Sequence, residues 1–196
     1  PPLEPVALTP LAKDVARQLM PLAANRDTEL RVAEDVELLA SASPDLLFRA
    51  VFNLVDNAIK YSGEGNMVTI RVSEAPGDRV QIAAQDLAPG ISPEQQPLIF
   101  ERFYRIDRGR SRREGGTGLG LPIVKELVQC MGGTIHVESE PGRGSTFVIT
   151  LDRTDGDETE PAVGARTPGR TPGESASASD DSRTPGGLHA GFPPAS

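Results

Sequence analysis

Four polar side chains recur on one side of a predicted helix, in the segment NLVDNAIKYS (residues 53–62). At 3.6 residues per turn, one stripe carries two amides, an amine and a phenol: Asn53, Asn57, Lys60 and Tyr61. The opposite stripe is apolar and predicts a core-facing side: Leu47, Val51, Leu54, Val55 and Ala58. Asparagine costs roughly half a kcal/mol or more relative to alanine inside a helix. Two asparagines one turn apart therefore indicate a task beyond contact with solvent.

A glycine-rich run, GGTGLGL (115–121), leads into another predicted helix. Glycines allow close approach of the backbone to a ligand, and a helix N-terminus presents free N–H groups and partial positive charge to an anion. The run is neither a Walker loop, because no Gly-Lys-Ser/Thr follows, nor a dinucleotide fingerprint, because no strand precedes it. A flexible hinge is the alternative interpretation.

The segment DLAPGI (86–91) follows a predicted strand. The carboxylate of Asp86 there can accept a hydrogen bond from an exocyclic amine such as that of adenine, and a tight turn would let the base lie against backbone. Taken alone, the motif fits a plain Asp-Pro-Gly turn better.

A basic and aromatic loop, IFERFYRIDRGRSRR (99–113), lies between these two motifs. Phe100 and Phe103 are expected to anchor it, and six arginines follow or surround them: Arg102, Arg105, Arg108, Arg110, Arg112 and Arg113. A solvated charge run is the ordinary explanation, but the position before the glycines favours a mobile lid over phosphates.

The pattern along the chain predicts the elements that position these residues. Thr9-Pro10 is typical of an N-cap followed by Pro at the first helical position. A first helix is predicted after it, because apolar residues then recur at helical spacing: Leu11, Val15, Leu19 and Leu22. Two more helices are predicted over residues 44–61 and 119–133, and six strands over 29–34, 36–41, 67–74, 79–86, 134–140 and 145–151, two of them joined as a hairpin by the turn 75–78. Helices with a mixed or antiparallel sheet predict an α+β fold, a two-layer sandwich of sheet on helices.

Composition divides the 196 residues into two parts. Residues 1–151 suit one globular domain, whereas 152–196 are rich in Pro, Gly and Ser, acidic, and expected to be a disordered tail. The net charge of −8 is shared evenly between the two parts, so neither offers a basic field for nucleic acid. The single cysteine, Cys130, suits a reducing compartment. We find no signal peptide and no apolar run that would span a bilayer, and we expect no membrane contact by this chain itself.

The order of these motifs resembles the catalytic, ATP-binding domain of bacterial sensor histidine kinases over about residues 8–151. NLVDNAIKYS corresponds to the N box, DLAPGI to the first glycine box and FERFYR to the F box; GTGLGL matches the second glycine box and PGRGSTF (141–147) the last glycine motif. The resemblance implies the Bergerat ATP-binding fold, with a mixed sheet packed on helices and ATP between the N box and the lid.

The resemblance also implies roles for single residues. Asn57 would hold the Mg²⁺ that bridges the ATP phosphates, because an amide oxygen suits a hard cation, and Asn53 would support it. Lys60 would contact phosphate oxygens and Tyr61 would lie against the adenine. Further nucleotide contacts would come from Asp86, which would recognise the adenine amine with Ser145 helping through water, and from Gly90, Ile91, Gly116, Thr117, Gly118, Leu119, Gly120 and Leu121.

Catalysis would then be positioning and charge stabilisation of an in-line phosphoryl transfer. Arg102, with Arg105 as a second candidate, would neutralise charge on the γ-phosphate. Fold relatives that hydrolyse ATP carry glutamate at position 53 to activate water, and the amide of Asn53 cannot serve as a general base. Transfer to a protein acceptor is therefore favoured over hydrolysis.

Two departures from the family pattern bear on this interpretation. Ala88 replaces the first glycine of the usual Asp-x-Gly-x-Gly box, which would weaken nucleotide binding if that site needs a positive φ. The dimerisation domain with the phosphorylated histidine is absent, and His136 and His189 are expected on a strand surface and in the tail. The chain is thus expected to bind ATP but to need a separate acceptor domain.

Three alternatives stay open at this point: a degenerate, non-catalytic nucleotide-binding or interaction module, supported by Ala88; a serine kinase of the anti-sigma-factor type; and a structural or adhesive domain. Asn53 and FERFYR argue against the second, and the two amides would be unexplained in the third. The expected partners are ATP, a histidine-containing dimerisation domain and a response regulator receiver domain. The expected location is cytoplasmic, as a free domain or as part of an inner-membrane receptor.

Overall fold

A computed structural model of the chain describes residues 1–33, 36–63, 65–87, 89–106 and 119–156. The chain separates into two compact units, Pro1–Thr159 and Glu160–Ser196. The described residues all belong to the first unit, and of the expected tail (152–196) only residues 152–156 are among them.

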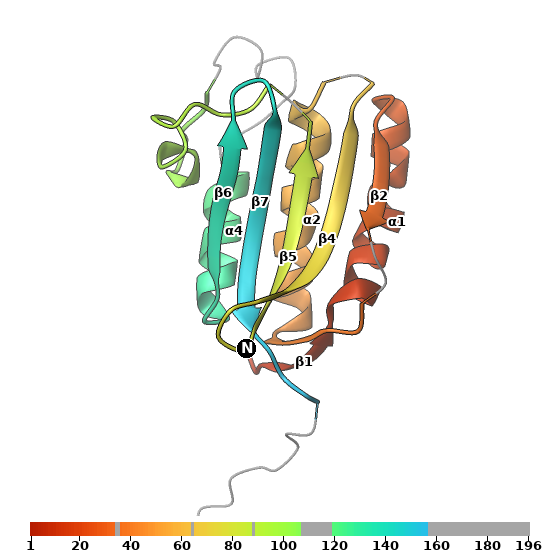
Figure 1. Cartoon of the computed structure of the whole chain (residues 1–196), viewed down its shortest axis with the longest axis vertical. Helices are drawn as coiled ribbons and strands as arrows, with labels where there is room; N and C mark the ends of the chain where they lie inside the picture. Colours follow the sequence, from red (N-terminus) through yellow and green to blue (C-terminus); the bar gives the residue numbers. More distant parts are fainter. Residues whose placement is uncertain (34–35, 64, 88, 107–118, 157–196) are drawn as a thin grey trace, which may run out of the picture. The chain divides into compact units, whose positions relative to one another are not determined.

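A five-stranded mixed sheet forms one layer of the first unit (Figure 1). Its strands lie in the order β2, β4, β5, β7, β6, with the bounds Glu29–Ala33, Met67–Ala75, Arg79–Asp86, Gly144–Asp152 and Thr134–Glu140. Strand β2 pairs with β4 in parallel, and the other pairs are antiparallel. A second, two-stranded antiparallel sheet joins β1 (Glu4–Ala7) to β3 (Leu39–Ala42).

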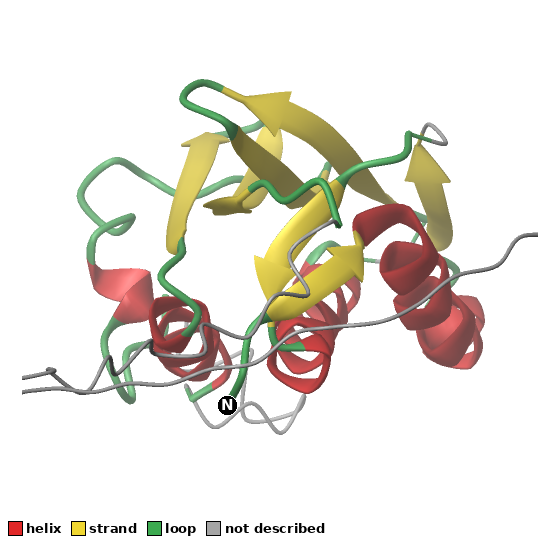
Figure 2. Ribbon diagram, turned by 90° about the horizontal axis from the view of Figure 1, so that it is seen from below, coloured by secondary structure: helices red, strands yellow, loops and turns green. Residues whose placement is uncertain are grey.

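Three helices form the second layer: α1 (Leu8–Asn25), α2 (Pro44–Tyr61) and α4 (Gly120–Cys130). Seen along the strands, they all lie on one side of the large sheet (Figure 2). Helix α2 packs between the other two and against β4 and β5. A short 3₁₀ helix, η1 (Leu98–Phe100), contacts α4. The predicted α+β fold, with a mixed sheet packed on helices, is confirmed.

The hydrophobic core lies between the two layers because each element is apolar on one side only. Strand β5 alternates buried and half-buried residues along its length, as the sequence RVQIAAQD predicts. The apolar stripe of α2 is buried as expected, with Leu47, Val51, Leu54, Val55 and Ala58 each 3% exposed or less. Burial of each larger side chain of this stripe contributes about 1.5–3 kcal/mol, which fixes the opposite, polar stripe in place.

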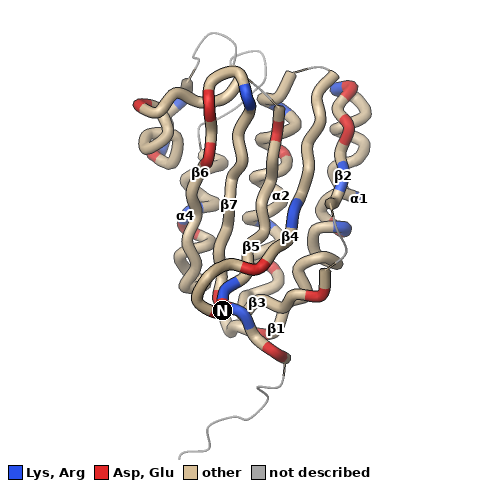
Figure 3. Tube along the Cα trace, in the orientation of Figure 1, with Lys and Arg blue, Asp and Glu red and all other residues tan. Residues whose placement is uncertain are grey.

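The other face of the large sheet carries polar side chains that form hydrogen bonds between neighbouring strands. Arg31 Nε donates to Thr69 Oγ1 at 3.2 Å, and Gln81 Nε2 donates to Thr150 Oγ1 at 3.2 Å. Charges of both signs are interspersed over the described chain (Figure 3). In the described part of the chain no helix is long and apolar enough to cross a bilayer.

The N-terminal elements differ from the prediction. Helix α1 begins at Leu8, so the prediction of Thr9 as the N-cap is wrong; its hydroxyl instead donates to the carbonyl of Val36 at 2.7 Å. Leu8 N donates to Leu38 O at 3.0 Å. Because the segment around residues 36–38 binds the start of α1, β3 begins only at Leu39, later than predicted. The neighbouring strand β1, which runs directly into α1, is absent from the prediction.

Candidate functional site

One edge of the large sheet gathers the sequence motifs, at the top of Figure 1. Helix α2 ends at Tyr61 and β4 begins at Met67, where Val68 pairs with Asp86 at the end of β5. Asp86 in turn pairs with Ser145 near the start of β7. The end of the polar stripe of α2, the end of β5 and the start of β7 therefore meet at one edge.

The polar stripe of α2 is accessible at this edge. Asn53, Asn57 and Lys60 are half-buried, and Tyr61 is 48% exposed. Asn53 uses its amide nitrogen to donate to the carbonyl of Arg49 at 2.8 Å, one turn earlier. Lys60 Nζ lies 2.6 Å from a carboxylate oxygen of Asp56, so a phosphate at Lys60 would share the ammonium with this partner.

Asn57 lies directly against the first residue of α4. A Cβ added at Gly120 would stand 2.9 Å from the Asn57 amide nitrogen, so a larger residue at position 120 would require the Asn57 side chain to move. The N-terminus of α4 carries backbone N–H groups that lack helical partners, and Pro122 occupies the first turn without a donor of its own. An amide and a helix N-terminus thus share one small space, which suits an anion accompanied by a cation.

Asp86 is a buried carboxylate, 6% exposed, and Ser145, 5% exposed, lies opposite it. The hydroxyl of Ser145 lies 2.9 Å from that of Ser139, on β6. Just after β5, Gly90 has a φ of +80°, and the buried Ile91 donates its backbone N–H to Ser139 Oγ at 2.8 Å. Asp86, Ser145, Gly90 and Ile91 are therefore brought together.

The two arginines of the F-box segment lie in different surroundings. Arg102 donates from Nη2 to Glu126 Oε1 of α4, and this hydrogen bond together with the carboxylate charge raises the pKa of Arg102. Its side chain is 66% exposed. Arg105 Nη2 is buried, and among the described residues it has no hydrogen-bond partner. A buried guanidinium nitrogen without a partner is costly, and an anion would satisfy it.

Four residues that bear on the site prediction lie outside the described residues: Ala88, Gly116, Thr117 and Gly118. So do Arg108, Arg110, Arg112 and Arg113 of the predicted lid. The end of the second glycine box is described. Leu119 is the N-cap of α4, Gly120 and Leu121 open the helix, and all three are half-buried.

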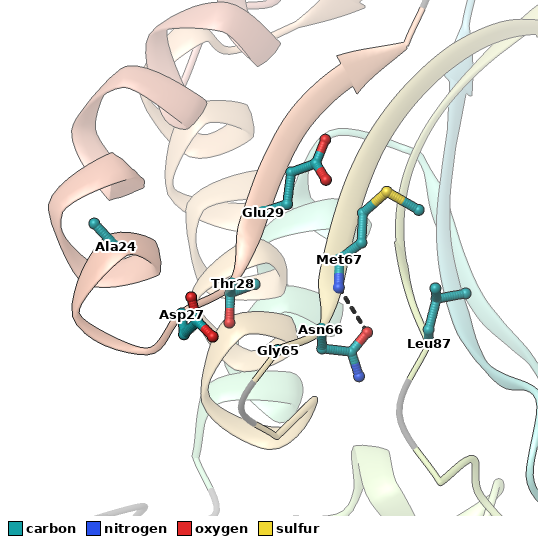
Figure 4. Close-up of a pocket in the computed structure, with 8 residues that line it drawn as sticks. All are labelled: Ala24, Asp27, Thr28, Glu29, Gly65, Asn66, Met67 and Leu87. Atoms are coloured by element: carbon teal, nitrogen blue, oxygen red, sulfur yellow. Dashed lines mark hydrogen bonds between the residues drawn. The ribbon is translucent and has the colours of Figure 1, made fainter.

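A pocket of about 630 Å³ lies at the same sheet edge but beside these residues (Figure 4). It lies between the end of α1 and the starts of β2 and β4, and its lining consists of Ala24, Asp27, Thr28, Glu29, Gly65, Asn66, Met67 and Leu87. Asn66 Oδ1 accepts the backbone N–H of Met67 at 2.7 Å across it. No predicted site residue lines this pocket, so the candidate site is the neighbouring region around Asn57 and Asp86.

His136 occupies the expected strand surface. It lies exposed on β6, with Nε2 3.2 Å from Glu138 Oε1. In the part of the chain that the structure describes, no cluster of three or more His, Cys, Asp or Glu residues could hold a metal ion.

The sequence prediction missed four residues that support the site: Ser139, Gln96, Glu126 and Asp56. Ser139 carries a detectable signal, because in the alternating strand TIHVESE it takes the inward side with Ile135 and Val137. Gln96, Asp56 and Glu126 carry no comparable signal, since polar side chains on a loop or helix surface are ordinary.

Comparison with protein families gives one match: the model described as "Histidine kinase-, DNA gyrase B-, and HSP90-like ATPase" fits residues 42–155. Among curated proteins, the chain is 46% identical over 127 residues to the sensor-like histidine kinase SenX3 of Mycobacterium tuberculosis. That alignment covers 65% of this chain and 31% of SenX3, so the chain spans about a third of the length of the curated relatives it matches.

Solved structures agree on the fold. The mycobacterial sensor histidine kinase MprB superposes with a TM-score of 0.63 at 32% identity, covering 77% of this chain and 97% of that one. Full-length ShkA, solved in complex with AMPPNP, superposes with a TM-score of 0.65 at 30% identity, covering 77% of this chain and 31% of ShkA.

Proposed function

The chain belongs to the histidine kinase-, DNA gyrase B- and HSP90-like ATPase family, as the catalytic ATP-binding domain of a sensor histidine kinase, and on this premise we propose that it binds Mg·ATP and transfers the γ-phosphate to a histidine on another domain. The observation that carries the proposal is the apposition of Asn57 and Gly120, at the sheet edge where Asp86 ends β5.

This geometry accounts for the polar stripe of α2. Asn57 would offer its amide oxygen to Mg²⁺, and the N–H groups at the start of α4 would donate hydrogen bonds to phosphate oxygens. Bound Mg²⁺ would supply neutralisation of phosphate charge. The cations that the chain itself would add are Lys60 and Arg105, whose Nη2 has no partner within the described residues.

The base would lie on the other side of the site. Asp86 would accept a hydrogen bond from the adenine amine, with Ser145 beside it, and the exposed ring of Tyr61 would stack on the base. A buried carboxylate is selective here, because a base without an amine at that position would leave it without this bond.

Transfer to a histidine, rather than hydrolysis, follows from Asn53. Its amide nitrogen is bonded to the helix backbone, and an amide cannot take a proton from water. The chain would position and stabilise the transferring group. The accepting histidine would belong to a dimerisation domain, and a response regulator receiver domain would take the phosphoryl group next.

Calorimetric titration of Mg·ATP into the full chain tests the proposal. Asn57→Ala should weaken binding by about tenfold or more, since it removes a ligand to the cation. Asn25→Ala is the matched control, because Asn25 is an exposed amide at the end of α1. Equal affinities of the parent and both variants, or no binding by the parent, would overturn the proposal.

A non-catalytic module is the second candidate, and Ala88 is the observation that favours it. The two candidates differ in whether a supplied acceptor domain becomes phosphorylated from labelled ATP. Labelling by the parent supports the kinase. No labelling by the parent, restored in Ala88→Gly, would favour the module.

A further inference from the structure

The serine at the end of β6 joins three segments at once. Ser139 Oγ accepts the backbone N–H of Ile91 at 2.8 Å and donates to the carbonyl of Gly144 at 2.8 Å. Since its single hydrogen goes to Gly144, the hydroxyl of Ser145, 2.9 Å away, is the donor in that pair. Strand β6, strand β7 and the chain that leaves β5 are thus tied by one hydroxyl.

A glutamine makes a second tie between the same segments. Gln96 Nε2 donates to the carbonyls of both Ile91 and Ser139, at 3.0 and 2.9 Å. In the β6–β7 turn, Gly142 N donates to the carbonyl of Pro89 at 2.6 Å. The turn and the loop are therefore joined by side-chain and main-chain bonds together.

Two glycines allow the backbones to come this close. A Cβ at Gly90 would stand 2.1 Å from the carbonyl oxygen of Glu140, and one at Gly144 would stand 2.1 Å from that of Asp86. Both glycines also have positive φ angles, +80° and +95°. A side chain at either position would separate the loop from the turn.

We propose that the β6–β7 turn, Pro141–Gly144, together with Ser139 and Gln96, is a brace that fixes the backbone following Asp86, so that the glycines of the last glycine motif support the first glycine box while Ser145 of the same motif remains beside the base. Ser139 and Gln96 are positioning residues, which act on the base through Asp86, Gly90 and Ile91. This role rests on the proposed function only for the identity of the ligand, because the brace itself is a property of the fold.

Loosening the brace should affect ligand binding differently from a general loss of protein stability. Its hydrogen bonds join β6, β7 and the loop after β5, on the side of the site assigned to the base, and among the described residues none of these bonds reaches α2 or the start of α4, where the phosphates would lie. Loosening it should therefore weaken binding of ATP while inorganic tripolyphosphate, which has no base, binds as before. A loss of folded protein would lower both equally.

The first test uses Ser139→Ala in the full chain, with Ser92→Ala as the matched control. Ser92 lies in the same loop, and its hydroxyl bonds only locally, to Gln95 at 3.1 Å. Amide hydrogen exchange of nucleotide-free protein should show Ile91 and Gly142 exchanging about tenfold faster in Ser139→Ala than in Ser92→Ala. Unchanged exchange at both amides would overturn the brace.

The second test is calorimetry of the same proteins with Mg·ATP and with Mg·tripolyphosphate. Ser139→Ala should weaken ATP binding about five- to tenfold and leave tripolyphosphate binding within about twofold. Equal weakening of both ligands would overturn the positioning role. Gln96→Leu, which removes both of its donated bonds, must give the same pattern and serves if Ser139→Ala does not fold. A parent that binds neither ligand would refute the proposed function, while the exchange measurement still decides the brace.

Discussion

The two sides of the candidate site differ in how firmly the fold holds them. On the base side, Asp86 and Ser145 are buried and paired across β5 and β7, and the adjoining loop is bonded to β6. On the arginine side, Phe103 is 71% exposed with a φ of +66°, and Arg102 is mostly exposed. The contrast teaches that the side proposed for the base is built in advance, whereas Phe103 and Arg102 on the arginine side are left adjustable.

This division suits the proposed chemistry. Pre-organised groups lower the ordering cost of binding, so affinity is best placed on the rigid side. Phosphoryl transfer needs charged groups aligned with a separate acceptor, and a segment with few fixed partners can adapt to it. Changes on the base side should therefore alter stability and binding together, and changes on the arginine side should alter transfer alone.

Gly144→Ala should break the rigid side most strongly. The new Cβ would meet the carbonyl oxygen of Asp86 at 2.1 Å and would hold a positive φ. We expect a loss of about 3 kcal/mol or more in the free energy of unfolding, measured by denaturant titration.

Gly142→Ala is the control for this substitution. Gly142 has a similar φ of +81°, but a Cβ there meets nothing within 4 Å. Its cost should be that of the positive φ alone, about 1 kcal/mol. Equal losses in the two variants would mean that the close approach of turn and loop does not contribute.

Arg105→Ala should show the opposite behaviour, with stability kept and transfer impaired. Removing a buried nitrogen that lacks a partner among the described residues should leave the free energy of unfolding within about 0.5 kcal/mol. Phosphorylation of a supplied acceptor domain should slow by about tenfold or more, because a charge that would meet the phosphate is lost.

Arg71→Ala provides the comparison, since Arg71 is exposed on β4, away from this edge. It should change neither quantity. A clear loss of stability in Arg105→Ala with unchanged transfer would place Arg105 in the fold rather than in the site.

The same contrast explains what could be predicted from the sequence. Helix α2 and the β4–β5 hairpin follow from local periodicity, and the apolar stripe of α2 predicted its buried face correctly. The motif order then predicted the family, because spacing along the chain is itself the signal. The individual roles assigned to Asn57, Lys60 and Arg102 stay predictions.

The brace could not be predicted in this way. Ile91 and Ser139 are 48 positions apart, and their contact depends on β7 lying between β5 and β6. Strand β1 was missed because it has only four residues, two of them exposed, and so shows too little alternation. It forms a strand through its pairing with β3. The contacts that position the site are thus mostly non-local, whereas the groups that would do chemistry are visible in short motifs.

The smallest expected effect comes from Glu126→Gln, which releases Arg102 on the adjustable side. The hydrogen bond to Glu126, and then the charge of that carboxylate, raise the pKa of Arg102 above the usual arginine value. A group whose folded pKa is raised contributes stability that is fully present below the unfolded pKa and is lost only as pH rises through the folded one. Arg102 stays protonated in both folded and unfolded states between about pH 6 and 9, so it adds no pH dependence to stability there. Through Arg102, the substitution should therefore not change how the free energy of unfolding varies with pH in this range.

Nucleotide binding is where the variant should differ. A freed Arg102 would be available to phosphate, so Mg·ATP affinity should rise about two- to threefold at low salt and return to the parent value as salt screens these exposed charges. Glu94→Gln removes the same charge from an exposed carboxylate in the loop after β5, without releasing Arg102. If calorimetry shows equal gains in the two variants, the gain comes from net charge, and Arg102 has no part in binding the phosphates. A gain confined to Glu126→Gln would place Arg102 among the groups that bind them, because only that variant changes which partner the guanidinium has.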